Sequence, residues 1–205
     1  MIWNTPKKPQ LVLVLAHGAG AGMEHPWMSR LAQELSETGI AVLRFDFPYM
    51  ENKKRRPDPP NVAVAAISKA VESAIERWPK LPVFAGGKSF GGRMTTTAAA
   101  QKKLSAVRGI ICFGFPLHPP NKPTVERALH LEQVTQPILF LQGTRDKLAD
   151  LNLIRQVVKK NSQITLHVVE GADHGFSVLK SSGRTDSEIW TEIKDAVSDF
   201  VKSAR

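Results

Sequence analysis

Three residues that could together break an acyl bond lie far apart in the chain: Ser89, Asp146 and His174. A serine hydroxyl is a weak nucleophile unless a neighbouring base takes its proton. His174 could be that base and could return the proton to the leaving group, while Asp146 could hold the tautomer of the imidazole and stabilise the imidazolium. These residue types, in this order, indicate nucleophilic acyl transfer.

The serine lies in the pattern Gly87-Lys88-Ser89-Phe90-Gly91, between an apolar strand and the start of a helix. This G-x-S-x-G spacing is typical of a nucleophile elbow, a strained turn from which the serine hydroxyl projects freely. Glycines two positions before and after the serine avoid a clash with neighbouring backbone. The same letters resemble the end of a Walker A loop, but Pro82 stands where that loop requires a glycine.

Two backbone N–H groups are candidates for an oxyanion hole. Phe90 follows the serine at the start of a helix, and Ala19 follows the His-Gly pair after the first apolar run. The glycines around Ala19 invite a dinucleotide-binding interpretation, but a G-x-G-x-x-G pattern from Gly18 would end at Met23. We therefore expect this loop to bind an oxyanion.

Each candidate residue also has an ordinary structural explanation. Ser89 could cap a helix, Asp146 could form a turn, and His174 could cap a turn. Asp173 is a second candidate for the acid. It adjoins His174 in the chain, where consecutive side chains diverge, so Asp146 is the preferred partner.

Apolar runs without alternation, typical of parallel strands covered on both faces, alternate with helical patterns along the chain. Strands are expected at 11–16, 40–47, 107–115, 137–142 and 164–169, with a sixth leading from Val83 into the elbow. We predict a mostly parallel six-stranded sheet with helices on both faces, in one domain spanning residues 1–205. Only about twenty residues separate the fourth strand from the fifth, so no large cap domain is expected.

Loops after the carboxyl ends of parallel strands line the ligand crevice of open α/β sheets. Tyr49, His118 and Phe176 lie in three of these loops, and we predict that they contact the substrate. The chemistry requires neither a metal nor a cofactor.

Composition places the chain among ordinary globular proteins, with 42% hydrophobic residues and a net charge of +9. The single cysteine, Cys112, excludes an internal disulfide and is expected to be a buried small hydrophobe. No apolar run is long enough to span a membrane, and the N-terminus lacks a signal-peptide layout. We expect a cytoplasmic protein, with the nucleus as an alternative. The loop Lys53–Arg56 could contact a protein partner, whereas binding to nucleic acid or membrane is not expected.

Five blocks of the sequence together resemble one family: residues 17–26, 44–50, 86–94, 115–120 and 142–146. It is the compact predicted α/β-hydrolase family, related to dienelactone hydrolases, which in animals includes a testis-expressed protein and a subunit of a histone-acetyltransferase complex. The resemblance implies a lidless serine hydrolase fold. Dienelactone hydrolases proper have a cysteine nucleophile where this chain has Ser89, so their substrate is not carried over.

Two classes of function are consistent with these residues. The first is a serine hydrolase, a carboxylesterase or related acyl hydrolase that acts on a small ester. The second is a non-catalytic binding or scaffold module on the same fold, which the basic loop Lys53–Arg56 and the scaffold member of the family keep open. The complete Ser-Asp-His set favours the hydrolase.

Overall fold

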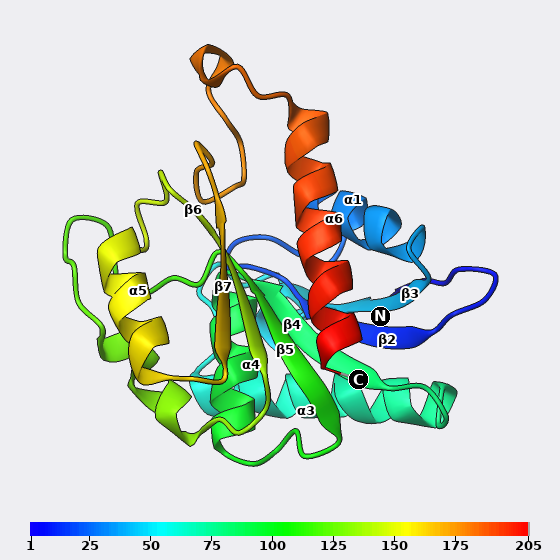
Figure 1. The fold of residues 1–205 in the computed structure, drawn as a ribbon. Helices are drawn as coiled ribbons and strands as arrows, with labels where there is room; N and C mark the ends of the chain where they lie inside the picture. Colours follow the sequence, from blue (N-terminus) through cyan, green and yellow to red (C-terminus); the bar gives the residue numbers. More distant parts are fainter. Residues whose placement is uncertain (205) are drawn as a thin grey trace.

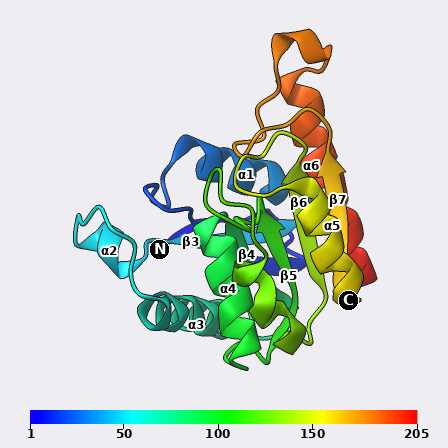
Figure 2. The same ribbon diagram turned by 90° about the vertical axis from the view of Figure 1, so that its left-hand side faces the viewer.

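The computed structural model describes residues 1–204. They form one sheet with strand order β1-β3-β2-β4-β5-β6-β7 and helices on both faces, as Figure 1 and Figure 2 show. The strands are β1 (Ile2–Asn4), β2 (Leu11–Ala16), β3 (Ile40–Phe45), β4 (Val83–Lys88), β5 (Val107–Phe113), β6 (Ile138–Gly143) and β7 (Ile164–Val169). The helices are α1 (Pro26–Ser36), α2 (Pro48–Glu51), α3 (Pro60–Arg77), α4 (Phe90–Ala100), α5 (Leu151–Lys160) and α6 (Asp186–Ser203), with 3₁₀ helices η1 (Glu126–Gln133) and η2 (Lys180–Ser182).

The sheet has one strand more than the six predicted. The additional strand, β1, pairs antiparallel with β3 at the edge of the sheet, with Trp3 opposite Leu43. Its three residues are only partly buried, so neither length nor hydrophobicity marks it in the sequence. The other six strands are parallel, which confirms the predicted architecture.

Alternate residues of the central strands pack into two separate cores. In β2, Val12 and Val14 pack in the core that also contains the buried residues of α3, α4 and α5. Leu13 and Leu15 point to the opposite face, where the core is completed by α1 and α6. All six residues of β2 are buried, which explains why the strand is an unbroken apolar run in the sequence.

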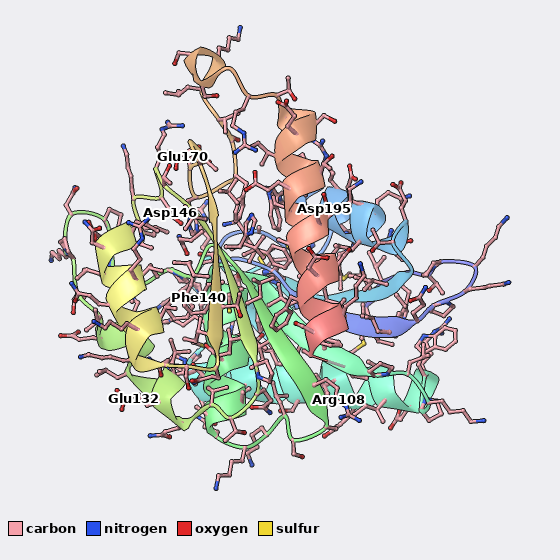
Figure 3. The ribbon with its side chains drawn as sticks, in the orientation of Figure 1. Arg108, Glu132, Phe140, Asp146, Glu170 and Asp195 are labelled. Atoms are coloured by element: carbon pink, nitrogen blue, oxygen red, sulfur yellow. The ribbon has the colours of Figure 1, made fainter. Side chains whose placement is uncertain are left out.

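The order of the strands determines where the loops that carry the site meet. The chain leaves β2, forms β3 on one side of it, and then returns to place β4 on the other side. Loops at such a reversal point form a crevice at the carboxyl ends of the strands. The loops after β6 and β7 reach the same end of the sheet. Figure 3 shows Phe140 within the sheet and Asp146 beyond the end of β6.

The stretch between β5 and β6 holds η1 and loops, and residues 1–204 contain no separate cap domain. Helix α6 begins with a capping box, in which Thr185 Oγ1 accepts from the N–H of Glu188 and the Glu188 carboxylate accepts from the N–H of Thr185. None of the helices in the described part of the chain has the length and hydropathy needed to cross a membrane.

Candidate active site

Ser89 occupies a strained turn between β4 and α4. Its φ of 50° and ψ of −113° lie outside the regions that residues with a side chain ordinarily adopt. Its N–H donates to Phe113 O at 3.0 Å, which ties the turn to β5. A Cβ atom added to Gly87 or Gly91 would lie 2.5 or 2.4 Å from Ala16 O, so both positions require glycine, as the elbow pattern predicts.

His174 and Asp146 are joined by a hydrogen bond across two loops. The Nδ1 atom of His174 lies 2.7 Å from the Asp146 Oδ2 atom, and the Asp146 side chain is inaccessible to solvent. The carboxylate also accepts from Gln142 Nε2 at 2.6 Å and from Leu148 N at 2.8 Å. These bonds fix the carboxylate, which in turn places the proton of His174 on Nδ1 and leaves Nε2 free to accept one.

The competing acid, Asp173, has a different task. Its Oδ1 atom accepts from the N–H groups of Gly175 and Ser177, at 2.8 and 2.9 Å, and so closes the turn that carries His174. Within residues 1–204, the carboxylate that hydrogen-bonds the His174 ring is therefore that of Asp146 and not that of Asp173.

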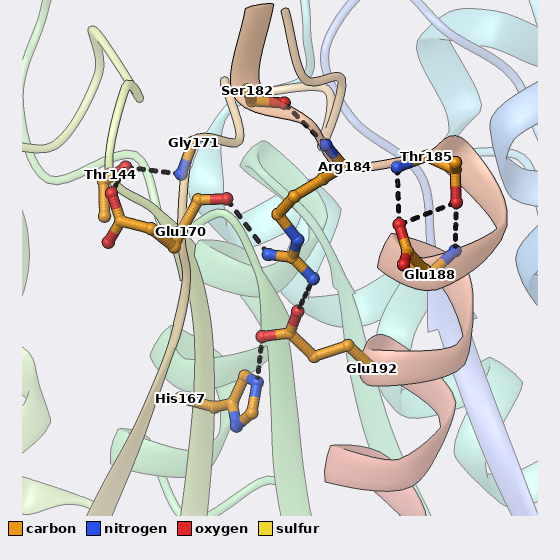
Figure 4. A network of polar contacts seen from close by, with 9 residues as sticks. All are labelled: Thr144, His167, Glu170, Gly171, Ser182, Arg184, Thr185, Glu188 and Glu192. Carbon is orange, nitrogen blue, oxygen red and sulfur yellow. Dashed lines mark hydrogen bonds and ion pairs between the residues drawn. The ribbon is translucent and has the colours of Figure 1, made fainter.

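Figure 4 shows how the loop after β7 is held in place. The Arg184 guanidinium donates to Glu170 O at 3.1 Å and forms an ion pair with Glu192 of α6. Glu192 also contacts His167 Nε2 of β7 at 2.8 Å. These contacts tie the two ends of the loop to β7 and α6. The loop that carries His174 is therefore held in one position.

Ser89 and His174 line the same pocket, which has a volume of about 220 Å³. The pocket is lined by Gly18, Ala19, Ala21, His25, Trp27, Met28, Lys88, Ser89, His174 and Gly175. No hydrogen bond within residues 1–204 engages the Ser89 hydroxyl. Catalytic hydrogen bonds are often long without substrate and tighten when one binds. The arrangement suits attack by the serine on a small substrate.

The loop after β2 holds the first candidate oxyanion donor. His17 is buried: its Nε2 accepts from Phe47 N at 3.1 Å, so its Nδ1 carries the proton and donates to Gly18 O at 2.8 Å. Burial lowers the pKa of His17, which favours this neutral form. The N–H of Ala19 donates to no acceptor within the described residues and lies on the pocket lining. The N–H of Phe90 belongs to the first turn of α4, where helical N–H groups lack a partner in the helix.

The three side chains predicted to contact the substrate are not among those that line this pocket. The Tyr49 hydroxyl accepts from Gly20 N at 3.2 Å and so supports the loop after β2. His118 accepts from Asp150 N at 2.8 Å and orders the start of α5. Phe176 is buried and stacks on Trp27, with ring centroids 6.0 Å apart.

Lys88 is a member of the site that the sequence patterns did not single out. It lines the pocket, and its Nζ atom donates to His174 O at 2.5 Å. The Nζ atom lies 5.6 Å from the ring centres of both Trp27 and Phe176. Burial lowers the pKa of Lys88 to about 8, although Asp146 and Asp173 partly oppose the shift.

A larger groove of about 750 Å³ lies between β7 and α6 and contains neither Ser89 nor His174. The reactive groups thus lie in the smaller pocket. Among residues 1–204, no group of three or more His, Cys, Asp or Glu side chains is arranged to hold a metal ion. Cys112 is buried, and burial raises the pKa of its thiol, as expected for a packing residue rather than a nucleophile.

Comparison with solved structures gives the same fold. An α/β serine hydrolase homologue from Coxiella burnetii matches with a TM-score of 0.75 and 20% identity, over 97% of this chain and 89% of the other. A dienelactone hydrolase from Anabaena variabilis matches with a TM-score of 0.74 and 19% identity, over 96% and 88%. A serine hydrolase without a lid from Xanthomonas campestris has a TM-score of 0.74 and 19% identity, over 97% and 87%.

Among curated proteins, a Mycobacterium tuberculosis protein whose name proposes a phosphoribosyl transferase is 29% identical over 182 residues. The match covers 84% of this chain but only 38% of that protein, so the chain spans well under half of its relative's length. The model of the family described as alpha/beta hydrolase domain matches residues 9–202. The chain therefore belongs to the alpha/beta hydrolase domain family.

Proposed function

We propose that the protein is a serine hydrolase that cleaves small carboxylic esters through an acyl-enzyme intermediate. The observation that carries the proposal is the pairing of a serine on a strained elbow with an imidazole whose Nδ1 atom is bonded to a buried carboxylate, 2.7 Å away. Both residues line one pocket. The names of the structural neighbours, which include serine hydrolases, add support.

The order of the steps follows from the tautomer of His174, whose Nε2 atom can accept a proton because Nδ1 is bonded to Asp146. Nε2 of His174 takes the proton of the Ser89 hydroxyl as Oγ attacks the ester carbonyl. The carbonyl π electrons move onto oxygen, and the N–H groups of Ala19 and Phe90 donate to that oxyanion. When the carbonyl re-forms, the C–O bond to the alcohol breaks and the imidazolium gives its proton to the departing oxygen.

Hydrolysis of the acyl-enzyme repeats these steps with water. The imidazole of His174 takes a proton from water, whose oxygen attacks the acyl carbon. Collapse of the second tetrahedral intermediate breaks the bond to Ser89 Oγ, which recovers the proton. Asp146 stabilises the imidazolium in both halves of the reaction and keeps its negative charge throughout.

The volume of the pocket limits the substrate. Ligand pockets for drug-sized molecules occupy about 300–1,000 Å³, whereas this one holds about 220 Å³. We therefore propose a short acyl chain or a small alcohol. We do not extend the transferase activity named for the curated relative to this chain, because the match covers only 38% of that relative.

A panel of p-nitrophenyl esters of increasing acyl length tests the proposal. The wild-type protein should release p-nitrophenol fastest from the shortest esters, and Ser89→Ala should reduce kcat by several orders of magnitude. Ser162→Ala, which alters an exposed serine far from β4 in the chain, serves as the matched control and should retain full activity. Equal rates for Ser89→Ala and wild type would refute the proposal.

A further inference from the structure

Lys88 places an ammonium group without a counter-ion beside the proposed nucleophile. Among the described residues, no carboxylate lies within 4 Å of its Nζ atom, the reach of an ion pair. An ammonium has three N–H donors, and the structure provides an acceptor for one of them, His174 O. A half-buried charge without a nearby counter-ion destabilises a folded protein, so Lys88 is a candidate for a role in binding.

The acids near Lys88 lie outside the lining of the pocket. The nearest acids, Asp146 and Asp173, attract the ammonium through space, but their oxygens are occupied by His174, Gln142 and backbone N–H groups. The pocket lining contains no carboxylate; besides Lys88, its titratable members are His25 and His174. An anion in this pocket would therefore meet the Lys88 ammonium directly, whereas Asp146 and Asp173 would act on it only from outside the lining.

The neighbouring aromatic side chains strengthen this interpretation. The Nζ atom lies 5.6 Å from the ring centres of both Trp27 and Phe176, within the distance at which an aromatic ring attracts a cation. The indole Nε1 of Trp27 is buried and donates to no acceptor within residues 1–204. The two remaining N–H donors of Lys88 are those that a carboxylate in the pocket would engage.

A purely structural role explains less of the arrangement. The bond from Lys88 Nζ to His174 O positions the histidine loop, but one neutral donor would be enough for that purpose. A positive charge becomes useful when a negative charge approaches it in a space that excludes water.

We propose that Lys88 binds a carboxylate on the substrate, so that the enzyme prefers esters carrying a carboxylate within a few atoms of the scissile bond. This inference rests on the proposed esterase function and names the substrate class of the same pocket. Half-esters of short dicarboxylic acids and esters of short hydroxy acids have the required chemistry.

Two pairs of esters test the inference because the members of each pair differ in charge but hardly in shape. Monoethyl succinate and ethyl succinamate differ on the acyl side, and O-acetylglycolate and O-acetylglycolamide differ on the alcohol side. In at least one pair, wild-type kcat/KM should favour the acid by about 10-fold or more, as expected for a charge-assisted hydrogen bond. The ratio should fall above pH 8, where Lys88 loses its proton.

In Lys88→Met, the ratio of kcat/KM for the acid to kcat/KM for the amide should be near one, whatever the overall rate of the variant. Lys88→Arg, which keeps the charge, should retain a preference for the acid. Lys147→Met removes an exposed lysine from the loop beside Asp146 and is the matched control; its ratio should equal that of the wild type. Protection of Ser89 from a fluorophosphonate by each ester provides the same comparison without turnover.

The outcomes separate the inference from the function on which it rests. Equal kcat/KM and equal protection within both pairs, in a wild-type protein that hydrolyses them or is labelled at Ser89, would overturn the role of Lys88 alone. An acid preference that survives in Lys88→Met would overturn it as well. Absence of both turnover and labelling in the wild type would overturn the esterase function, and this inference with it.

Discussion

Replacing Lys88 by methionine should stabilise the folded protein near neutral pH. The folded-state pKa of Lys88 is lowered from 10.5 to about 8, mainly by burial. A pKa difference of one between the folded and unfolded states corresponds to about 1.4 kcal/mol, so the charged lysine destabilises the fold by up to about 3 kcal/mol. Methionine removes the charge but also the hydrogen bond to His174 O, which contributes about 1 kcal/mol. The net gain expected for Lys88→Met at pH 7 is therefore about 2 kcal/mol.

The pH dependence of this stability difference shows whether the charge of Lys88 causes it. Because the folded pKa lies below the unfolded one, the penalty is fully present below pH 8 and disappears as the pH rises toward 10.5. Urea unfolding at several pH values between 7 and 10.5 measures the difference in the free energy of unfolding between Lys88→Met and the wild type. The other titratable groups are the same in both proteins, so their contributions cancel in this difference. The advantage of Lys88→Met should shrink and then reverse over this interval. An advantage that is constant with pH, or a variant less stable at pH 7, would refute the electrostatic argument.

Three further predictions concern the elbow, the acid and the basic loop. Gly87→Ala should prevent the elbow from forming as observed and abolish ester hydrolysis, because its Cβ would lie 2.5 Å from Ala16 O; wild-type activity in this variant would contradict the steric argument. Asp146→Asn should reduce kcat by about 10⁴-fold, as loss of the orienting carboxylate does in a comparable triad, whereas Asp173→Asn should reduce it far less; the reverse order in steady-state kinetics would show that the acid is misassigned. Neutralising the exposed loop Lys53–Arg56 should weaken salt-sensitive retention on an anionic matrix and leave esterase activity unchanged; unchanged retention would remove the support for a protein partner at this loop.

The parallel sheet was predictable because its strands are buried on both faces. Leu11–Ala16 and Ile40–Phe45 are wholly buried, and such runs are visible in the sequence alone. The strand Ile2–Asn4 could not be recognised in this way, because it is short, only partly buried and defined by its pairing with β3.

The pairing of Asp146 with His174 could be expected because both follow adjacent parallel strands, β6 and β7. The buried positions of the Tyr49 and His118 side chains could not be expected from the sequence. They depend on hydrogen bonds to Gly20 and Asp150, which lie in loops distant in the chain. The role of Lys88 was hidden for a similar reason. Burial lowers its pKa, and its contacts with Trp27, Phe176 and the His174 carbonyl involve segments distant in the chain.

The most direct test of the account is the covalent labelling of Ser89 by a fluorophosphonate, followed by intact-protein and peptide mass spectrometry. The wild-type protein should gain a single adduct, located on Ser89, because among residues 1–204 only this hydroxyl combines the strained elbow with a pocket shared with His174. Ser89→Ala should gain none while its circular dichroism remains that of the wild type. An adduct on another serine, or no adduct on the folded wild-type protein, would contradict the assignment of Ser89 as the nucleophile.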